Sequence, residues 1–266
     1  MKATVFLGGG RITGALIAGL RLSNDRRRIV VYDRHPDKLR RLKKTYGIVP
    51  EPDLQMAVAQ ADLLMVAVRP DSVRDLLRDI GQVERPLVAI SLAAGVPLAN
   101  LRQALGPPVR WVRAMPSPVF RSGSGLTGLC FDHAFPARAK SAIRNLFSRA
   151  GQIVEVPESQ FDAFTVTYSS SHGYHALATL AGAAEKLGLK PGTALLAAAH
   201  ALADGILAWR RDSISLRTLM NEAATPGGIA AEVIAAADRS GYRKAVERAL
   251  MAGMRRARQN AKGGQG

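Results

Sequence analysis

The hydrophobic residues in the first half of the chain gather in short, unbroken runs, with helical patterns between several of them. Unbroken apolar runs are typical of strands that are covered on both faces of a sheet. Ile12, Leu16 and Leu20 are spaced so that they share one face of a helix. This alternation predicts an α/β fold with a mostly parallel, doubly wound sheet. The expected strands are Ala3–Leu7, Ile29–Tyr32, Leu63–Val68, Leu87–Leu92, Val109–Ala114, Leu126–Phe131 and Ile153–Val156.

The pattern changes after Pro157, where alanine and leucine dominate and we expect no further strand. Alanine and leucine are strong helix formers, so this half is predicted to be helical. Several of its stretches are apolar on more than one face, and such a helix has to be buried. The second half offers little else to cover these faces, so we expect a homodimer or a larger homo-oligomer. We therefore place an α/β domain over residues 1–156, an all-α helical dimerisation domain over residues 157–262, and a disordered tail over residues 263–266.

The composition favours a soluble, cytoplasmic protein. The chain has 266 residues, of which 47% are hydrophobic, and this is enough to bury a core. Cys130 is the only cysteine, which rules out an intrachain disulfide and fits a reducing compartment. The apolar stretch Val5–Leu7 is too short for the hydrophobic region of a signal peptide. The longest apolar run, Ala194–Trp209, contains His200 and Asp204 and falls short of the ~20 residues that a membrane span needs.

The formal net charge of +16 allows two interpretations, an anionic partner or a basic, solvated surface. The basic residues form scattered clusters, and only 5% of the residues are aromatic, so platforms on which bases could stack are scarce. We favour the basic surface and expect neither nucleic acid nor a membrane as a partner. The clusters lie within residues 26–28, 38–44 and 255–262.

The first expected strand leads directly into Gly8-Gly9-Gly10-Arg11-Ile12-Thr13-Gly14. This run fits the G-x-G-x-x-small pattern of dinucleotide-binding loops, with Thr13 in the third position. Gly8 permits a tight turn, and Gly10 lacks a Cβ, so a diphosphate can approach the backbone at the positive end of the following helix. The first domain is therefore predicted to be a Rossmann-type domain. The candidate cofactor residues of its loop are Gly8, Gly10, Arg11, Ile12 and Thr13.

The residues after the second expected strand bear on the choice of cofactor. Asp33 follows the glycines by about twenty residues, where a carboxylate binds the ribose hydroxyls of adenosine. A carboxylate there repels a 2′-phosphate and favours NADH. Arg34 beside it, and Arg11 in the loop, could instead pair with that phosphate and favour NADPH. We expect NAD(P)H with a slight preference for NADH.

Five further segments occur in order along nearly the whole chain. They are Val66-Ala67-Val68-Arg69-Pro70, Ile90-Ser91-Leu92-Ala93-Ala94-Gly95, Arg113-Ala114-Met115-Pro116, Gly123-Ser124-Gly125-Leu126-Thr127 and Thr225-Pro226-Gly227-Gly228. They resemble the V-A-V-K-P, S-I-A-A-G, R-x-M-P, G-x-G-x-T and S-P-G-G motifs of the pyrroline-5-carboxylate reductases. That order along the chain is more specific than any one of the motifs.

The resemblance implies an NAD(P)H-dependent oxidoreductase that reduces the C=N bond of a small, carboxylate-bearing cyclic imine, as in proline biosynthesis. It also implies that the segment from Thr225 to Gly228 binds the substrate. By itself this segment predicts a helix start, with Thr225 as N-cap, Pro226 at N1 and bare backbone N–H groups that suit a carboxylate. The candidate substrate residues are Thr225, Pro226, Gly227 and Gly228, and the added candidate cofactor residues are Val68, Arg69, Pro70, Ala94 and Met115.

Three departures from the family motifs fall in the substrate region, and we therefore expect an altered substrate. Ser117 replaces an asparagine, and Y-S-S-S-H-G-Y at residues 168–174 replaces S-G-S-G-P-A-Y. Ala230 replaces a threonine whose hydroxyl is the family's candidate near the imine nitrogen. A general acid typically contributes about a hundredfold or more, so another donor would be useful. The candidate catalytic residues are Tyr168, His172 and Tyr174, and Ser170 is a further candidate for substrate binding.

Other functions stay open at this point. A 2-oxo- or 3-hydroxy-acid oxidoreductase could use the same plan, and Ala230 favours a catalytically inactive dinucleotide-binding sensor or scaffold. We expect no metal site, because His172 and His175 have no third ligand at a suitable spacing. Ser170, His172 and Asp162 are the residue types of a hydrolase triad, but no nucleophile-elbow motif accompanies them.

Overall fold

The computed structural model describes residues 3–212 and 214–262, and these residues form two compact units. The first unit contains the described residues up to Tyr168 together with those from Ala252 onward, and the second is Ser169–Met251. The border expected after residue 156 lies nearer the N-terminus than this division and stays a prediction. The expected tail, residues 263–266, lies outside the described residues.

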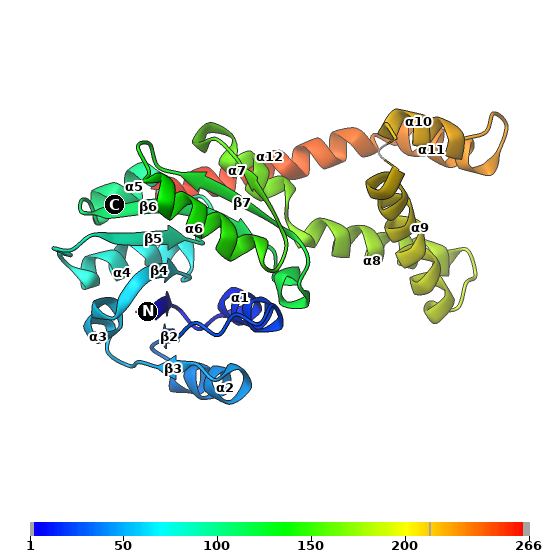
Figure 1. The fold of residues 1–266 in the computed structure, drawn as a ribbon. Coiled ribbons are helices and arrows are strands. Elements are labelled where there is room, and N and C mark those ends of the chain that lie inside the picture. The colour runs from blue at the N-terminus through cyan, green and yellow to red at the C-terminus, as the bar shows by residue number, and fades with distance from the viewer. Residues whose placement is uncertain (1–2, 213, 263–266) are drawn as a thin grey trace. The chain divides into compact units, whose positions relative to one another are not determined.

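The first unit is built on an eight-stranded sheet with the order β3-β2-β1-β4-β5-β6-β7-β8 (Figure 1). Neighbouring strands are parallel except β6 and β7, which are antiparallel. This confirms the doubly wound fold and every expected strand, with ends shifted by a residue or two. The strands are β1 (Ala3–Leu7), β2 (Ile29–Tyr32), β3 (Val49–Pro50), β4 (Ala61–Val66), β5 (Leu87–Ser91), β6 (Val109–Pro116), β7 (Leu126–Phe131) and β8 (Gln152–Glu155).

Strand β3 was missed by the sequence analysis because only two residues pair, and one of them is a proline at the edge of the sheet. Proline cannot donate a hydrogen bond to the ladder and is confined to such edge positions. By contrast, every residue of β1 is buried, as the unbroken apolar run predicts.

Helices cover both faces of the sheet (Figure 1). One core lies between the sheet and α1, α2 and α6, and the other lies between the sheet and α3, α4, α5 and α7. Their bounds are α1 (Arg11–Leu22), α2 (Pro36–Tyr46), α3 (Leu54–Ala59), α4 (Val73–Ile80), α5 (Leu98–Ala104), α6 (Ala137–Ser148) and α7 (Glu158–Thr167), and two 3₁₀ helices are η1 (Pro70–Ser72) and η2 (Pro118–Ser122). This two-sided cover explains why the central strands are hydrophobic throughout.

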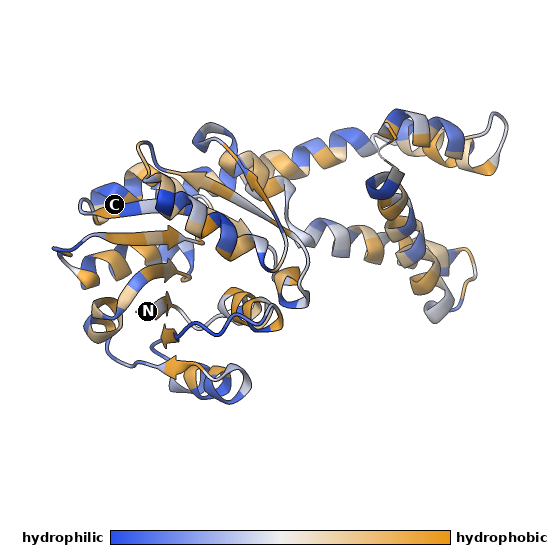
Figure 2. Ribbon diagram, viewed as in Figure 1, coloured by the Kyte–Doolittle hydropathy of each residue, from blue (hydrophilic) through white to orange (hydrophobic). Residues whose placement is uncertain are grey.

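The second unit is helical, and no strand occurs in the described residues after β8. Hydrophobic residues recur along α8, α9 and α11 (Figure 2), and many of their side chains are exposed. The helices are α8 (Ser170–Lys186), α9 (Pro191–Asp212), α10 (Leu216–Ala223), α11 (Ile229–Arg239) and α12 (Tyr242–Lys262), of which the last part belongs to the first unit. A helical second half is therefore confirmed.

Helix α9 is longer than the sequence analysis allowed. Its segment Pro191–Arg211 is long and apolar enough to cross a membrane by length and composition alone, and little of it is buried. The prediction that this apolar stretch is too short for a membrane span was wrong, because the helix begins before Ala194 and continues past Trp209. His200 and Asp204 stand one turn apart on it, with 3.1 Å between Nδ1 and Oδ2. Length and hydropathy do not separate a membrane span from a helix that another protein surface covers.

Candidate cofactor and substrate site

The glycine loop leaves β1 through a turn that only glycine fits. Gly8 has a φ of +110°, and a Cβ on it would lie 2.7 Å from the carbonyl oxygen of Ala67. The Gly8 N–H donates to the carbonyl of Tyr32 over 2.8 Å, so the turn is fixed to the end of β2. Glycine adopts a positive φ without steric cost, whereas other residues do not. Gly8 therefore directs the chain across the edge of the sheet, as expected of the first glycine in such a loop.

Gly10 has a different role, because a Cβ on it would meet no atom within 4 Å. It is the N-cap of α1, in an extended conformation and without a side-chain cap, so the first N–H groups of the helix have no partner from that residue. These N–H groups and the helix dipole favour an anion. The space beside Gly10 and the charge at the helix start fit a diphosphate.

Thr13 occupies the third position of the loop and is completely buried. Its hydroxyl donates to the carbonyl of Gly8 over 2.6 Å. This bond satisfies the hydroxyl and braces the turn, and so explains how a residue larger than glycine fits where the helix packs closely on the strand. Ile12 is partly buried against the core on the α1 face, and Arg11 is exposed at the helix start.

The carboxylate of Asp33 lies at the end of β2, as predicted, but its oxygens point back into the protein. Oδ2 accepts from the N–H of Gly9 over 2.7 Å, and Oδ1 accepts from the N–H of His35 over 2.9 Å. Lys38 Nζ lies 3.2 Å from Oδ2 and 3.3 Å from Oδ1. Burial alone would raise the pKa of Asp33, but these bonds outweigh it and the pKa is lowered. Only 9% of the side chain is exposed, so the carboxylate holds the glycine loop in place.

The other candidate cofactor residues gather at the same edge of the sheet. Strands β1, β4, β5 and β6 are neighbours, so the segments that follow their carboxyl ends converge, and ligands bind there in doubly wound folds. A Cγ of Val68 is close to the glycine loop, since a Cβ on Gly8 would lie 3.3 Å from it. The side chains of Arg34 and Arg69 are exposed. Val68, Arg69, Pro70, Ala94 and Met115 thus lie at the carboxyl edge, and their contacts with a cofactor stay a prediction.

A buried arginine joins β6 to α7. The Arg113 side chain is 2% exposed, and its Nη1 donates to Glu158 Oε1 over 2.7 Å while Nη2 donates to Asp162. The guanidinium carbon lies 4.5 Å from the ring centroid of Phe161. Asp162, set aside above as part of a hydrolase triad, is therefore a partner of Arg113. Arg113 stands in one of the family motifs, but its role between β6 and α7 was not predicted from the sequence.

Cys130 lies beside the same cluster. Its Sγ is 3.3 Å from Glu158 Oε2, and burial, together with the charge of Glu158, raises the pKa of the thiol to about 12. A thiol with this pKa stays protonated at neutral pH and is a poor nucleophile. Cys130 therefore belongs to the packing of this region.

The candidate catalytic residues fall on two units. Tyr168 ends α7 in the first unit, and its hydroxyl oxygen accepts from the N–H of Leu126 over 2.6 Å, which joins α7 to the start of β7. Ser170, His172 and Tyr174 lie in the first turns of α8 in the second unit, where His172 and Tyr174 are exposed. The catalytic roles of Tyr168, His172 and Tyr174 stay predictions, and the hydroxyl of Tyr168 already has a structural partner.

The segment Thr225–Gly228 is a turn, and the predicted helix start was placed too early. The N–H of Gly228 donates to the carbonyl of Thr225 over 2.9 Å, and Gly227 has a φ of +76°. Pro226 followed by a glycine with positive φ is the type II turn pattern. Gly228, not Thr225, is therefore the N-cap, and α11 begins at Ile229. The turn still places two glycines, whose backbone N–H groups no side chain covers, directly before the N-terminus of α11.

Within the described residues, no three His, Cys, Asp or Glu side chains are grouped so that they could hold a metal ion. His175, one of the two histidines considered above, has its Nδ1 3.4 Å from the Thr179 hydroxyl.

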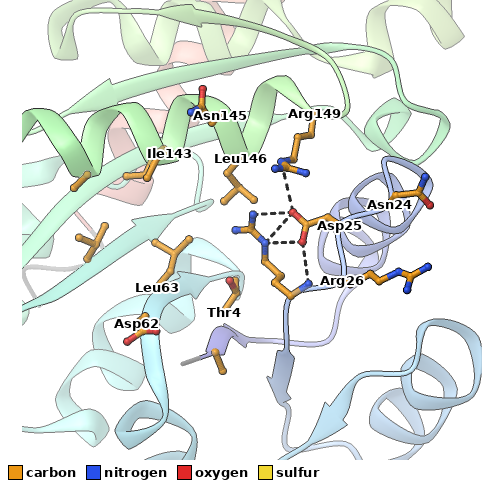
Figure 3. A pocket seen from close by; sticks show the side chains of 15 residues that line it. Thr4, Asn24, Asp25, Arg26, Asp62, Leu63, Ile143, Asn145, Leu146 and Arg149 are labelled. Carbon is orange, nitrogen blue, oxygen red and sulfur yellow. Dashed lines mark hydrogen bonds and ion pairs between the residues drawn. The ribbon is translucent and has the colours of Figure 1, made fainter. Parts of the chain in front are cut away.

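A cavity of about 700 Å³ lies at the opposite edge of the sheet, near the amino ends of β1, β4 and β5 (Figure 3). Asp25 is buried at its rim between two arginines. Arg27 Nη2 lies 2.7 Å from Asp25 Oδ2, and Arg149 Nε lies 3.7 Å from the same oxygen. Because the carboxylate joins the α1–β2 connection to the end of α6, this cluster supports the fold rather than the cofactor edge.

Asp25→Asn is expected to destabilise the protein by about 2 kcal/mol at pH 7, because the charge-assisted hydrogen bonds from Arg27 and the ion pair with Arg149 are weakened or lost. Burial would raise the pKa of Asp25, but the bonds from Arg27 and the charge of Arg149 lower it. A lowered pKa in the folded state contributes stability above the unfolded value, and this contribution is lost as the pH falls through the folded value. The difference between wild type and Asp25→Asn in urea unfolding should therefore shrink below about pH 4. The exposed Asp37, replaced in Asp37→Asn, is the matched control, and an equal loss there would contradict the prediction.

The fold and its loop define a dinucleotide-binding α/β protein with a helical second part. Residues 4–95 match the family model described as NADP oxidoreductase, coenzyme F420-dependent, and residues 158–260 match the model for pyrroline-5-carboxylate reductase dimerisation. A pyrroline-5-carboxylate reductase from Mycobacterium leprae is 30% identical over 97% of both chains. The chain belongs to the pyrroline-5-carboxylate reductase family.

Solved structures agree with this assignment. A pyrroline-5-carboxylate reductase from Coxiella burnetii is 26% identical, with a TM-score of 0.85 over 98% of this chain and 99% of that one. A pyrroline carboxylate reductase from Plasmodium falciparum, solved with NADP bound, has a TM-score of 0.87 over 98% of both chains at 19% identity, and so shows the shared fold. The family expected from the sequence motifs is confirmed.

Proposed function

We propose that this protein is an NAD(P)H-dependent reductase of a C=N bond in a small, carboxylate-bearing cyclic imine. The observation that carries the proposal is the loop between β1 and α1, in a chain that belongs to this family. The space beside Gly10 is open there, and it lies at the positive end of α1. A nicotinamide cofactor bound there supplies a hydride to the imine carbon. The chain's own residues bind the diphosphate, orient the cofactor and exclude water.

The turn at Thr225–Gly228 is the proposed site for the substrate carboxylate. Its glycines leave the backbone bare, and α11 begins directly after Gly228, so N–H groups at a helix start are available to an anion. Reduction also requires a proton on the imine nitrogen, and Ala230 carries no hydroxyl to deliver it. A cyclic iminium ion that binds already protonated would avoid this need, and otherwise His172 or Tyr174 on α8 is the proposed donor.

We also propose that the substrate differs from pyrroline-5-carboxylate or that this compound is a poor substrate. The support lies in the altered residues Ser117 and Ala230 and in the altered segment 168–174. Ser117 is buried and uses its hydroxyl to accept from the N–H of Val119 over 3.2 Å, so it caps η2. A side chain that serves the backbone in this way has less capacity for a ligand than a longer amide would have.

A panel of cyclic imines with and without a carboxylate, assayed with NADH and NADPH, tests the function. Turnover of a carboxylate-bearing imine, and slow or absent reduction of pyrroline-5-carboxylate, is the expected result. Proline formation at the rate of ordinary family members would contradict the altered substrate. Turnover of 2-oxo or 3-hydroxy acids alone would favour the second enzyme class. Tight cofactor binding without turnover of any compound would favour the inactive sensor or scaffold.

The residues that follow β2 bear on the choice between NADH and NADPH. The slight preference for NADH rests on a carboxylate that repels a 2′-phosphate, but the charge of Asp33 is balanced by Lys38 and by two backbone N–H groups. Arg34 and His35 are exposed beside it. The balanced charge of Asp33 and the exposed guanidinium of Arg34 favour a site that also accepts the 2′-phosphate. Fluorescence titrations with both nucleotides test the preference, and NADPH binding that is tenfold tighter would show that Asp33 does not set it.

We propose that the second unit forms a homo-oligomer through its apolar helices, and that the protein works in the cytoplasm. Leu207 on α9 is 59% exposed in one chain, together with other large apolar side chains of that helix. Leu207→Glu is expected to raise the dissociation constant about tenfold or more, because the interface would have to bury a charge. Native mass spectrometry at micromolar concentration measures the effect.

Leu22→Glu in α1 is the matched control for that variant, since Leu22 is 62% exposed but lies in the first unit. The control should keep the mass of the wild-type assembly. A monomeric wild-type protein at micromolar concentration would remove the proposed oligomer.

A further inference from the structure

The loop after β5 is covered by the last turns of α12. Gly95 has a φ of +75°, and a Cβ on it would lie 2.7 Å from the carbonyl oxygen of Ala257. Ala257 is the buried residue of α12, so this contact is a close approach of two backbones. Both segments belong to the first unit. The small residues at 93–95 permit the helix to rest directly on the loop.

Side-chain hydrogen bonds from two asparagines, one on α12 and one on α5, stabilise this contact. Asn260 Nδ2 donates to the carbonyl of Ala94 over 3.1 Å. Asn100 Nδ2, from α5, donates to the carbonyl of Ala261 over 2.8 Å. The second bond satisfies a carbonyl at the C-terminal end of α12, where helices leave such groups without partners. The loop and the helix end thus hold each other, and each asparagine belongs to a different element.

The same loop is joined to the cofactor edge by backbone bonds. The N–H of Leu92 donates to the carbonyl of Val66 over 2.9 Å, and the N–H of Ala67 donates to the carbonyl of Leu7 over 2.8 Å. Gly8 follows Leu7 and begins the glycine loop. The loop after β5 is therefore joined, through β4, to the segment that precedes the glycines.

We propose that Asn260 is a positioning residue for cofactor binding, acting through the carbonyl of Ala94. This inference rests on the proposed function, because it assumes that the carboxyl edge of the sheet holds the nicotinamide nucleotide. Asn260 holds the loop after β5 against α12. It thereby fixes the position of this loop at the carboxyl edge of the sheet, between the ends of β4 and β6. Its effect falls on the affinity for the cofactor, whereas the chemical step uses other groups.

The test compares wild type with Asn260→Ala and Asn260→Asp. The first variant removes the donor, and the second retains the size but places a carboxylate against the carbonyl of Ala94. Each should raise the Kd and KM for the nicotinamide nucleotide about three- to tenfold, the range expected for one hydrogen bond. The kcat at saturating cofactor and the KM for the imine should stay within about twofold. Gln259→Ala is the matched control, because Gln259 is the exposed neighbour on the same helix.

A purely structural role would give a different pattern. In that case the midpoint of thermal unfolding falls, but the Kd for the cofactor in folded protein is unchanged, and this would overturn the proposal. Should Asn260→Ala fail to fold, Asn100→Ala loosens the same contact from the other side, and its cofactor Kd decides. Hydrogen exchange should show faster exchange in residues 92–97 of whichever variant folds. If wild-type protein itself binds neither nucleotide, the proposed function fails, whereas equal Kd values in wild type and variants defeat this inference alone.

Discussion

Gly10→Ala is expected to weaken binding of NADH and NADPH by about a hundredfold while the protein stays folded. The added Cβ meets no protein atom within 4 Å, so the fold has room for it. It would, however, stand where a diphosphate must approach the backbone at the start of α1. The free energy of unfolding should fall by at most about 1 kcal/mol, since alanine is a poorer N-cap than glycine. Fluorescence titration and urea unfolding of the same samples separate the two effects.

Gly8→Ala is the informative counterpart of that variant. Its Cβ would lie 2.7 Å from the carbonyl oxygen of Ala67, and its φ of +110° is unfavourable for alanine. We expect the loss of stability here to be several times that of Gly10→Ala. Unchanged nucleotide binding in Gly10→Ala would contradict the placement of the diphosphate, and equal stability losses for the two variants would contradict the different steric surroundings of Gly8 and Gly10.

Arg113→Met is expected to destabilise the protein by about 3 kcal/mol, because two carboxylates lose the buried guanidinium that holds them. Arg113 is 2% exposed, whereas Glu158 and Asp162 are partly exposed and so retain some solvation. Methionine keeps most of the side-chain volume, which limits the contribution of a cavity. The midpoint of urea unfolding measures the loss.

Arg144→Met provides the comparison. Arg144 pairs with Glu155 at the surface, where ion pairs contribute about 0–1 kcal/mol. A difference between the two variants of less than about 1 kcal/mol would show that the Arg113 cluster does not hold α7 to the sheet.

The sheet and the glycine loop were predictable because their signals are local. Unbroken apolar runs marked the strands, and the spacing of Gly8, Gly10 and Thr13 marked the loop. The orientation of Asp33 was not predictable, since Lys38 and the N–H of Gly9 compete with a ribose for the same carboxylate. The sequence located the residue at the right edge of the sheet but could not show which way its oxygens point.

The turn before α11 illustrates a competition between two local signals. Thr225 is a favourable N-cap, and Pro226 is favourable at the first helical position. The same two residues also fit a type II turn when a glycine follows, and the positive φ of Gly227 decides for the turn. The helix therefore starts later than the capping pattern alone suggests.

Contacts between distant residues left no trace in the sequence pattern. Asn260 and Ala94 are separated by 166 positions, and neither stands in a periodic stretch that indicates a partner. Gly95 was the one available signal, because a glycine at the end of a strand motif often marks a close approach of backbones. It could not have named α12 as the neighbour.

The cover over Gly95 also bears on how the protein is made. The strands of the sheet end at Glu155, yet Ala257 and Asn260 follow them only after the helices of the second unit. Domains generally fold as the chain emerges, but contacts between distant segments have to wait for both partners. The nascent α/β domain should therefore keep a loosely packed nucleotide edge until α12 has been synthesised, and a product truncated before α12 should be more exposed to proteases than a chain that contains it.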